Sequence, residues 1–257
     1  NMATSSSSII LFFSSLLFNH LNIQQIMQTI ESQLSELRLS GMKKSWQSIV
    51  DTRRQHDLNL VEGIEMLLDA ELIERGNRRT SRLTKNAAFR YQATIEQIRY
   101  DTSRGLDKSL ITSLATGNFI PEGSSVIITG ATGCGKSYLA SALGHQACML
   151  GYKVAYYNVQ KLMMKTRMAR IDGSIYKFFD KTSKTDLLIL DDFGLTHLEK
   201  QQQLDFMELI EDRHGSKATI LASQLPLASW FDIIGEETIA DAILDRLVHS
   251  SYKIELK

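Results

Sequence analysis

The amino-acid sequence predicts an α/β fold: a parallel β-sheet sandwiched by helices, preceded by a small all-α N-terminal domain. Three observations support this fold class. From residue 126 onward, short apolar runs of strand length alternate with helical stretches, which is the pattern of parallel sheets. A glycine-rich loop joins the first apolar run to the helix after it. Between residues 27 and 104, apolar residues recur only at helical spacing.

The composition is that of a globular protein. The chain has 257 residues, of which 43% are hydrophobic and 23% charged, enough for one or two domains with a real core. The 29 basic and 29 acidic residues cancel, so a nucleic-acid surface would need an uneven distribution of charge. The two cysteines, Cys134 and Cys148, form no CxxC pair, which excludes a disulfide framework and predicts a cytoplasmic protein.

Residues 1–26 differ from the rest of the chain. A serine run at 5–8 precedes an apolar block at 9–18 that two serines interrupt. The block is shorter than the about 20 apolar residues that span a bilayer, and it lacks the basic region and cleavage site of a signal peptide. We expect a disordered or non-native extension, a natural start at Met27 and no membrane partner. A targeting segment and a local helix are the alternatives.

Residues 27–104 are predicted to form a helical N-terminal domain with a basic arm. Apolar side chains recur at helical spacing over 30–42, 46–50 and 60–72, as in a small helical bundle. Basic residues follow, opposed only by Glu96 and Asp101; the candidates for DNA binding are Arg75, Arg78, Arg79, Arg82, Lys85 and Arg90. Such a stripe would bind double-stranded DNA without sequence preference. The alternatives are a solvated face and pairing with the acids of residues 62–74, and the sequence favours neither interpretation.

Residues 105–257 are predicted to form the α/β domain. A linker at 105–123 contains a short helix over 108–115, and its Phe119 and Ile120 are candidates for contact with a nucleotide base. Strands are expected at 126–129, 154–157, 187–190, 219–222 and 252–256. Helices are expected between them, near 136–150, 160–169, 174–180, 200–213, 228–234 and 239–247. Ligands of such a fold bind at the carboxyl ends of the strands.

A phosphate-binding loop lies between the first strand and its helix. Its residues fit the pattern G-x-x-x-x-G-K-[ST] and are Gly130, Ala131, Thr132, Gly133, Cys134, Gly135, Lys136 and Ser137. The glycines allow backbone N–H groups to surround a phosphate, and the helix start adds the positive end of its dipole. Lys136 is expected to reach the β- and γ-phosphates, and Ser137 to ligate Mg²⁺. The sequence therefore predicts ATP and Mg²⁺ as cofactors.

Acidic and polar residues follow the next buried strands. Asp191 and Asp192 come directly after the continuous apolar run at 187–190. We expect Asp191 to hold Mg²⁺ and Asp192 to orient or deprotonate the attacking water. Ser223, followed by Gln224, ends the strand after that, and a polar residue there would sense the γ-phosphate; a simple loop hydrogen bond is the alternative.

An arginine near the end of the last helix is a candidate for catalysis in a neighbouring subunit. Arg246 follows Asp245 shortly before the final strand. Arginines that stabilise a transferred phosphoryl group contribute about 10³–10⁵ in rate. A local pair with Asp245 is the alternative reading, and Arg213 is the competing candidate.

Five longer stretches carry a resemblance to a known family. They are Gly-Leu-Asp-Lys at 105–108, the P-loop and its flanks at 128–140, the acidic strand at 187–194, Ala-Ser-Gln-Leu-Pro at 222–226 and the helix at 238–248. Together they resemble the IstB-like transposition helper ATPases of the AAA+ superfamily, which are close to the DnaC-type helicase loaders. The similarity covers about residues 27–257.

The resemblance implies a function. Members bind and hydrolyse ATP, assemble as homo-oligomers on double-stranded DNA, and stimulate a partner transposase of an insertion sequence. By position, Lys136 and Ser137 carry over as phosphate and Mg²⁺ residues, Asp191 and Asp192 as the acidic motif, Ser223 as the polar sensor and Arg246 as the inter-subunit arginine. The chain stops directly after its last strand, so a full C-terminal helical lid is not expected.

Two other functions remain open from the sequence. In a DnaC-like loader, the N-terminal helices would bind a replicative helicase instead of duplex DNA. In a nucleotide-gated architectural protein, ATP would be bound but hydrolysed slowly, since Asp192 stands where glutamate is commoner and its shorter side chain would hold water less well.

Overall fold

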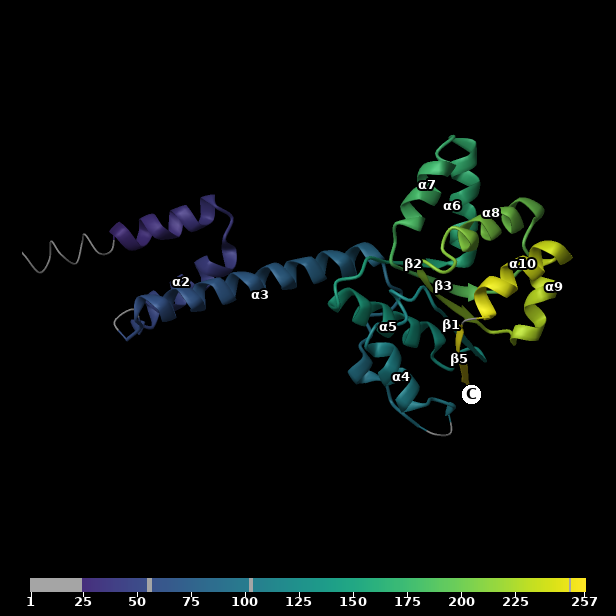
Figure 1. Cartoon of the computed structure of the whole chain (residues 1–257), viewed down its shortest axis with the longest axis horizontal. Helices are drawn as coiled ribbons and strands as arrows, with labels where there is room; N and C mark the ends of the chain where they lie inside the picture. The colour runs from purple at the N-terminus through teal and green to yellow at the C-terminus, as the bar shows by residue number, and fades with distance from the viewer. Residues whose placement is uncertain (1–24, 55–56, 102–103, 250) are drawn as a thin grey trace, which may run out of the picture. The chain divides into compact units, whose positions relative to one another are not determined.

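The computed structural model describes residues 25–54, 57–101, 104–249 and 251–257 (Figure 1). The chain divides into two compact units, residues 1–79 and 80–257. This division lies before residue 105, where the sequence led us to expect the second domain to begin. The prediction for the extension 1–26 lies outside the described residues, except that residues 25 and 26 already belong to a helix.

The first unit is helical in its described part, as predicted. A helix over residues 25–36 precedes α2 (Ser40–Asp51), and α3 (Leu60–Ala87) begins in this unit and ends in the second. Helices α2 and α3 touch at Gly41, where a Cβ would lie 2.3 Å from the Ala70 carbonyl oxygen. Only glycine allows this close approach of two backbones.

Buried Glu71 of α3 caps the N-terminus of α2. Leu39, the residue before this helix, makes no side-chain cap, and the Glu71 carboxylate accepts hydrogen bonds from the backbone N–H groups of Gly41 (2.7 Å) and Met42 (3.3 Å). Burial by itself raises the pKa of Glu71, but the hydrogen bond from Arg75 and those two N–H groups outweigh it and lower the pKa below its ordinary value. The ionised carboxylate therefore accepts hydrogen bonds from N–H groups at the start of α2 that have no partner within the helix.

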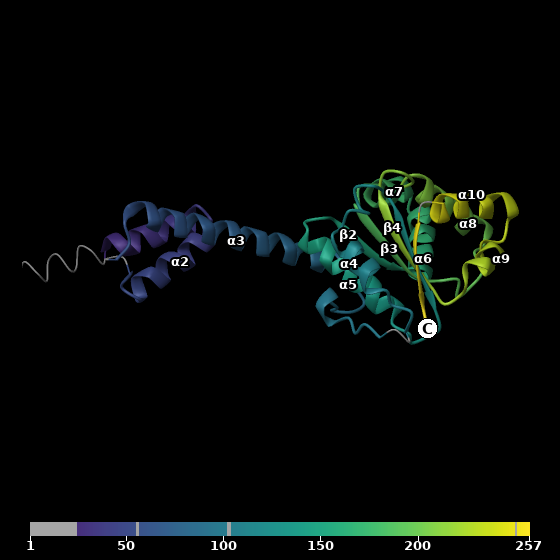
Figure 2. The same ribbon diagram turned by 60° about the horizontal axis from the view of Figure 1, so that its bottom comes forward.

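The second unit is an α/β domain around an all-parallel, five-stranded sheet. The strands are β1 (Ser125–Gly130), β2 (Val154–Asn158), β3 (Leu187–Phe193), β4 (Ala218–Ser223) and β5 (Ser251–Leu256), in the order β2-β3-β4-β1-β5 (Figure 2). The α-helices are α4 (Lys108–Ala115), α5 (Lys136–Met149), α6 (Val159–Ile171), α7 (Ile175–Ser183), α8 (Lys200–Glu211), α9 (Trp230–Ile234) and α10 (Glu237–Val248), and 3₁₀ turns are η2 (Ile95–Gln97) and η4 (Leu227–Ser229). The predicted fold class is confirmed.

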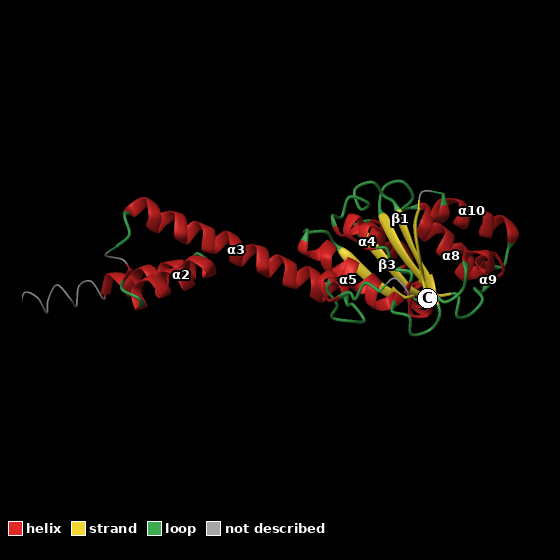
Figure 3. Cartoon of the chain, turned by 90° about the horizontal axis from the view of Figure 1, so that it is seen from below, coloured by secondary structure: helices red, strands yellow, loops and turns green. Residues whose placement is uncertain are grey.

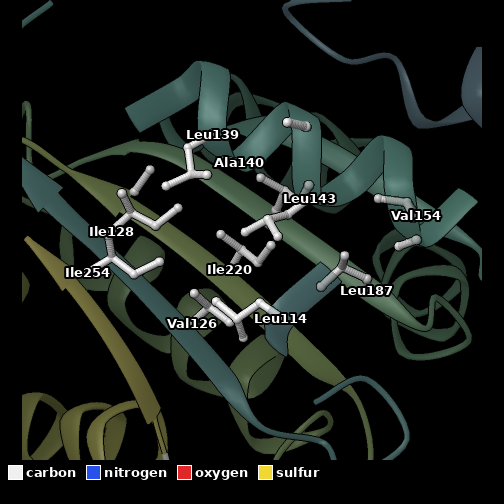
Figure 4. Close-up of a cluster of buried hydrophobic side chains, with 14 of the residues drawn as sticks. Leu114, Val126, Ile128, Leu139, Ala140, Leu143, Val154, Leu187, Ile220 and Ile254 are labelled. Atoms are coloured by element: carbon white, nitrogen blue, oxygen red, sulfur yellow. The ribbon is translucent and has the colours of Figure 1, made fainter. Parts of the chain in front are cut away.

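The helices cover both faces of the sheet, because alternate residues of each strand point to opposite sides. Ile189 of β3 packs in one apolar cluster and Leu190 in the other, and both are fully buried. The first cluster joins α4 and α5 to the sheet, with Leu143 of α5 lying over the strands (Figure 4). The second joins α6, α7, α8, α9 and α10 to the other face (Figure 3). This double burial explains the continuous apolar run of β3.

The segment between α3 and α4 packs into the first cluster. Helix α3 ends where Ala88 takes the left-handed conformation at φ 57°. Beyond it, Ala93, Ile98 and Leu106 are buried beside α5 and the sheet. The end of the predicted basic arm is thus part of the α/β unit.

Among the residues that the structure covers, no helix combines the length and apolar character needed to cross a membrane.

Candidate nucleotide-binding site

The P-loop connects β1 to α5 at the carboxyl edge of the sheet. Its glycines take conformations that other residues rarely adopt: Gly133 has φ 83° and Gly135 has φ 102°. Gly130 is needed for another reason, since a Cβ there would lie 2.2 Å from the Leu256 carbonyl oxygen of β5. The loop is therefore built from positions at which side chains are strained or excluded.

Lys136 folds back over this loop. Its Nζ donates to the carbonyl oxygens of Gly130 (2.7 Å) and Ala131 (2.8 Å), and the residue is only 6% exposed. The ammonium is thus held at the loop, where a phosphate surrounded by the backbone would meet it. The contact of Lys136 with the β- and γ-phosphates stays a prediction.

Ser137 and Asp191, the two predicted Mg²⁺ ligands, are brought together across 54 residues of sequence. The Ser137 hydroxyl donates to Asp191 Oδ1 at 3.0 Å. A hydroxyl and a carboxylate are hard oxygen ligands of the kind that Mg²⁺ takes together with phosphate oxygens and water. The donor set therefore fits Mg²⁺ bound to a nucleoside triphosphate.

Tyr156 of β2 fixes the other oxygen of Asp191. The phenol of Tyr156 donates to Asp191 Oδ2, and the Asp191 residue is 1% exposed. Burial, together with this hydrogen bond to the carboxylate, raises the pKa of Tyr156 well above its ordinary value. The phenol stays neutral and keeps its proton as a donor. The sequence did not single out this residue, because a tyrosine in an apolar strand carries no motif.

Asp192 sits on a bulge at the end of β3. Its backbone is left-handed, at φ 59°, and the pairing of β3 with β4 shifts register between Leu190 and Phe193. Asp tolerates this conformation better than most residues. Its Oδ2 accepts hydrogen bonds from Asn158 Nδ2 of β2 and from Arg90 Nη1, both at 2.9 Å.

Asp192 also borders a cavity. This cavity has a volume of about 280 Å³ and lies between the first turns of α6 and the loop after β3, with Gln160, Met163 and Thr196 in its lining. The carboxylate is therefore placed beside the predicted Mg²⁺ ligands and next to an open space in which a water molecule has room.

A second cavity adjoins the P-loop on its other side. It measures about 380 Å³ and is lined by the apolar residues Ile98 and Leu106 and by Tyr138, but also by the polar or charged side chains of Gln97, Arg99 and Arg104. Arg104 also donates from Nη2 to the Cys134 carbonyl oxygen at 2.7 Å. A cavity next to a phosphate loop that combines apolar side chains with a few polar ones suits a nucleotide base and its ribose.

Phe119 and Ile120, which we expected to contact the base, do not line that cavity. Each is 3% exposed and packs in the apolar cluster beneath α4 and α5. The sequence showed two apolar residues before the P-loop but could not show that they turn into the core.

Two polar residues, Ser223 at the end of β4 and Gln224 directly after it, make different contacts. Ser223 is fully buried; its hydroxyl donates to the Phe193 carbonyl oxygen (2.8 Å) and accepts from the Leu225 N–H (3.1 Å). Gln224, the next residue, accepts a hydrogen bond at its Oε1 from the Thr132 hydroxyl of the P-loop at 2.7 Å. The side chain that reaches the loop is therefore Gln224, whereas Ser223 ties β4 to β3.

Arg246 lies at the opposite edge of the sheet from the P-loop. It lies near the end of α10, the helix that precedes β5. Strand β5 starts at Ser251, which pairs with Ser125, the first residue of β1. Six residues of strand separate the two edges by about 20 Å. Arg246 donates to the Ala242 carbonyl oxygen (2.9 Å) and pairs with Glu211 of α8, not with Asp245. In this arrangement Arg246 is remote from the P-loop of its own chain.

Arg213, the competing candidate, is an internal residue. It is 1% exposed and donates to the carbonyl oxygens of Thr182 (2.8 Å) and Thr185 (2.9 Å) and to the Thr219 hydroxyl (3.1 Å). Burial lowers its pKa to about 10. Because its guanidinium is bound inside the domain, Arg213 cannot project toward a neighbouring subunit.

The basic residues predicted to bind DNA have separate surroundings. Arg75 and Arg78 lie on α3 and pair with Glu71 at 2.8 Å and 3.5 Å. For these two residues the structure therefore shows the alternative in which they pair with an acidic residue of the segment 62–74. Arg79, Arg82 and Lys85 are exposed residues of the same helix. Arg90 lies beyond the helix and contacts Asp191 and Asp192 instead.

The chain is similar to known proteins over most of its length. A family model described as IstB-like ATP binding protein matches residues 32–257. A protein of Sinorhizobium fredii named as an insertion sequence ATP-binding protein is 39% identical over 224 residues, which are 87% of this chain and 91% of that protein. The corresponding protein of insertion sequence IS1162 from Pseudomonas fluorescens is 42% identical over 196 residues, or 76% and 85% of the two chains.

Solved structures share the fold of the α/β unit. The DnaC helicase loader aligns with a TM-score of 0.51 and 21% identity over 61% of this chain and 95% of its own. AMPPCP-bound DnaA from Aquifex aeolicus aligns with a TM-score of 0.55 and 19% identity over 66% and 51%. The match over most of its length shows that this chain belongs to the family of IstB-like ATP-binding proteins.

Proposed function

We propose that this protein is an ATP-binding and ATP-hydrolysing helper of an insertion sequence, which assembles on target DNA and stimulates a partner transposase. One observation carries the enzymatic part of this proposal: the Ser137 hydroxyl lies 3.0 Å from Asp191, directly after the P-loop lysine. Hydroxyl, carboxylate and ammonium thus meet where the β- and γ-phosphates of ATP would lie.

The residues of the site divide the chemistry between them. The P-loop N–H groups and Lys136 bind the phosphates, and Ser137 and Asp191 hold the metal ion. Bound Mg²⁺ neutralises charge that develops on the phosphate oxygens during hydrolysis. Asp192, beside the cavity of about 280 Å³, orients or deprotonates the attacking water. Gln224, hydrogen-bonded to Thr132, takes the sensing role that the sequence assigned to Ser223.

The roles in DNA binding and transposition rest on other support. The curated relatives are named as ATP-binding proteins of insertion sequences, and the exposed side chains of Arg79, Arg82 and Lys85 on α3 provide positive charge. Duplex DNA would be bound through its phosphates. Arg246 is remote from the P-loop of its own chain. If it takes part in hydrolysis, it would therefore act on the nucleotide of a neighbouring subunit. The likeness to DnaC, at 21% identity, concerns the fold and does not favour helicase loading.

The first test of the proposal combines ATP hydrolysis and DNA binding. We expect the full chain to bind a fluorescent ATP analogue, to hydrolyse ATP, and to shift duplex DNA only when ATP is present. Lys136→Ala should lose analogue binding by at least about tenfold, since it removes a charge at the phosphates. Lys253→Ala, which removes an exposed lysine of β5, is the matched control and should behave like the wild type. Unchanged analogue binding in Lys136→Ala would contradict the assignment of the site.

A further inference from the structure

Arg90 makes an unexpected contact with the acidic pair. Its Nη1 lies 2.9 Å from Asp192 Oδ2 and 3.5 Å from Asp191 Oδ2. Arg90 precedes the two adjacent aspartates by 101 and 102 positions in the sequence, yet all three belong to the same compact unit. The functions proposed for the P-loop and the acidic motif do not require an arginine from this segment.

Aromatic neighbours on both sides hold Arg90 in place. Phe89 packs edge-on against Tyr156, with ring centres 6.3 Å apart, and Tyr91 lies 6.3 Å from the ring of Tyr138. Phe89 also lies against Gly144 of α5, where a Cβ would come within 2.5 Å of its ring. Phe89 and Tyr91 thus fix the backbone on either side of Arg90 against β2 and the P-loop helix.

The contact also balances charge. Asp191 is 1% exposed and Asp192 has an 18% exposed side chain, and two such neighbouring carboxylates repel each other when both are ionised. Arg90 keeps a half-exposed side chain and supplies the opposing charge from the solvent side. Burial acts to lower the pKa of Arg90, but Tyr91, Asp192 and Asp191 outweigh it and raise the pKa.

We propose that Arg90 is a positioning residue of the nucleotide site, which neutralises the acidic pair, competes with the divalent cation for Asp191, and holds Asp192 in its left-handed bulge. The inference rests on the proposed function, because it assigns the metal ion to Asp191 and the water to Asp192. Arg90 and the metal ion carry like charges and share a carboxylate, so tighter binding of either one weakens the other. The same Nη1 atom makes both contacts, and the one to Asp192 Oδ2 is the shorter; the proposal requires this contact to remain when a cation takes the place of Arg90 at Asp191.

The test measures metal binding without nucleotide. Mn²⁺ serves as the probe, and its free concentration is followed by electron paramagnetic resonance in the presence of the full chain. We expect Arg90→Ala and Arg90→Gln to bind Mn²⁺ about tenfold more tightly than the wild type, since each removes a competing unit charge. Arg90→Lys should restore the weak binding of the wild type. Asp191→Asn should abolish the site, and Lys253→Ala should leave it unchanged.

The second readout is hydrolysis by the same variants. Arg90→Ala, Arg90→Gln and Arg90→Lys should each lower kcat about tenfold with little change in KM for Mg·ATP, because none of them keeps the planar guanidinium that places a donor against Asp192, while phosphate binding is retained. Circular dichroism establishes that each variant is folded, and Arg90→Gln, which keeps the size and a hydrogen-bond donor, serves if Arg90→Ala unfolds.

The outcomes separate this inference from the proposed function. Equal Mn²⁺ affinity in wild type, Arg90→Ala and Arg90→Gln would overturn the role of Arg90, even if the wild type binds and hydrolyses ATP normally. Tighter Mn²⁺ binding in those variants would support it even if the wild type hydrolysed no ATP, in which case the proposed function would be the part that fails.

Discussion

Two cysteines of the chain differ sharply in their surroundings. Cys148 of α5 is fully buried, and burial raises its pKa to about 11. Cys134 lies in the P-loop with partial exposure, and its carbonyl group accepts from Arg104. The thiolate is the reactive form of cysteine. Cys148, which is buried and has a raised pKa, should therefore be modified more slowly than the partly exposed Cys134.

Thiol labelling at pH 8 should therefore report directly on the nucleotide site. One thiol per folded chain should react rapidly with a disulfide reagent, and Cys134→Ser should remove that reaction. ATP with Mg²⁺ should slow it several-fold, because the bound phosphates cover the loop. Rapid reaction of two thiols, or a rate that nucleotide leaves unchanged, would contradict the placement of these residues.

Ser223 and Gln224 are neighbours in the sequence, but we expect their substitutions to have different effects. Ser223→Ala should lower the free energy of unfolding by about 1–3 kcal/mol, because it removes the hydroxyl that donates to the buried Phe193 carbonyl oxygen and accepts from the Leu225 N–H. Gln224→Ala should leave stability nearly unchanged and reduce kcat. Urea unfolding and steady-state hydrolysis of the two variants distinguish these effects, and a reversal of the two patterns would restore Ser223 as the sensor.

At the scale of elements, the contact between α2 and α3 depends on one ionised side chain. Because the pKa of Glu71 is lowered in the folded chain, its stabilising contribution is present above the unfolded-state value and is lost as the pH falls through the folded-state value. The stability that Glu71 gives the first unit should accordingly decline only as the pH falls below 4.5, the ordinary pKa of a glutamate, whereas Glu71→Gln should be less stable at neutral pH and less dependent on pH.

The two tryptophans make this measurable for one unit at a time. Trp46 lies in α2 and Trp230 in α9, so each compact unit contains one of them. In a Trp230→Phe background, the fluorescence of Trp46 during urea unfolding should show a lower midpoint for Glu71→Gln at pH 7 and convergence with its parent near pH 3. Parallel curves at both pH values would contradict the role of Glu71.

Much of the secondary structure was predictable from the sequence because periodicity is local. The run at 187–190 shows double burial without reference to other strands, and the P-loop is identified by the short pattern that runs from Gly130 to Ser137 between a strand and a helix. The strand order β2-β3-β4-β1-β5 was not predictable in this way, since it depends on which crossover covers which face. The contact of Arg90 with the acidic pair was not predictable for a related reason: its partners lie at the end of β3, 101 and 102 residues later, and a count of basic residues cannot show them.

At the scale of the whole molecule, the position of Arg246 determines whether it can act within one chain or only between two. Helix α10 places it at the amino edge of the sheet, whereas the P-loop lies at the carboxyl edge. A single chain therefore cannot bring this arginine to its own nucleotide in the observed arrangement. If Arg246 assists hydrolysis, a second subunit has to supply it.

Mixing two inactive variants tests this directly. Lys136→Ala and Arg246→Ala should each hydrolyse ATP at a strongly reduced rate. In a random equimolar mixture, about a quarter of head-to-tail interfaces combine an intact P-loop with an intact arginine, and activity should partly return. A mixture no more active than the average of its components would show that Arg246 does not act between subunits, and its pair with Glu211 would then be its whole role.

The most direct test of the account is whether assembly needs ATP and DNA together. Sedimentation velocity of the full chain would be recorded alone, with ATP and Mg²⁺, with a duplex of about 50 base pairs, and with both. We predict large complexes only when both ligands are present, and their loss in Lys136→Ala and Arg246→Ala. A chain that binds ATP but stays monomeric on duplex DNA would contradict the proposed role in transposition and leave a nucleotide-binding protein with another partner.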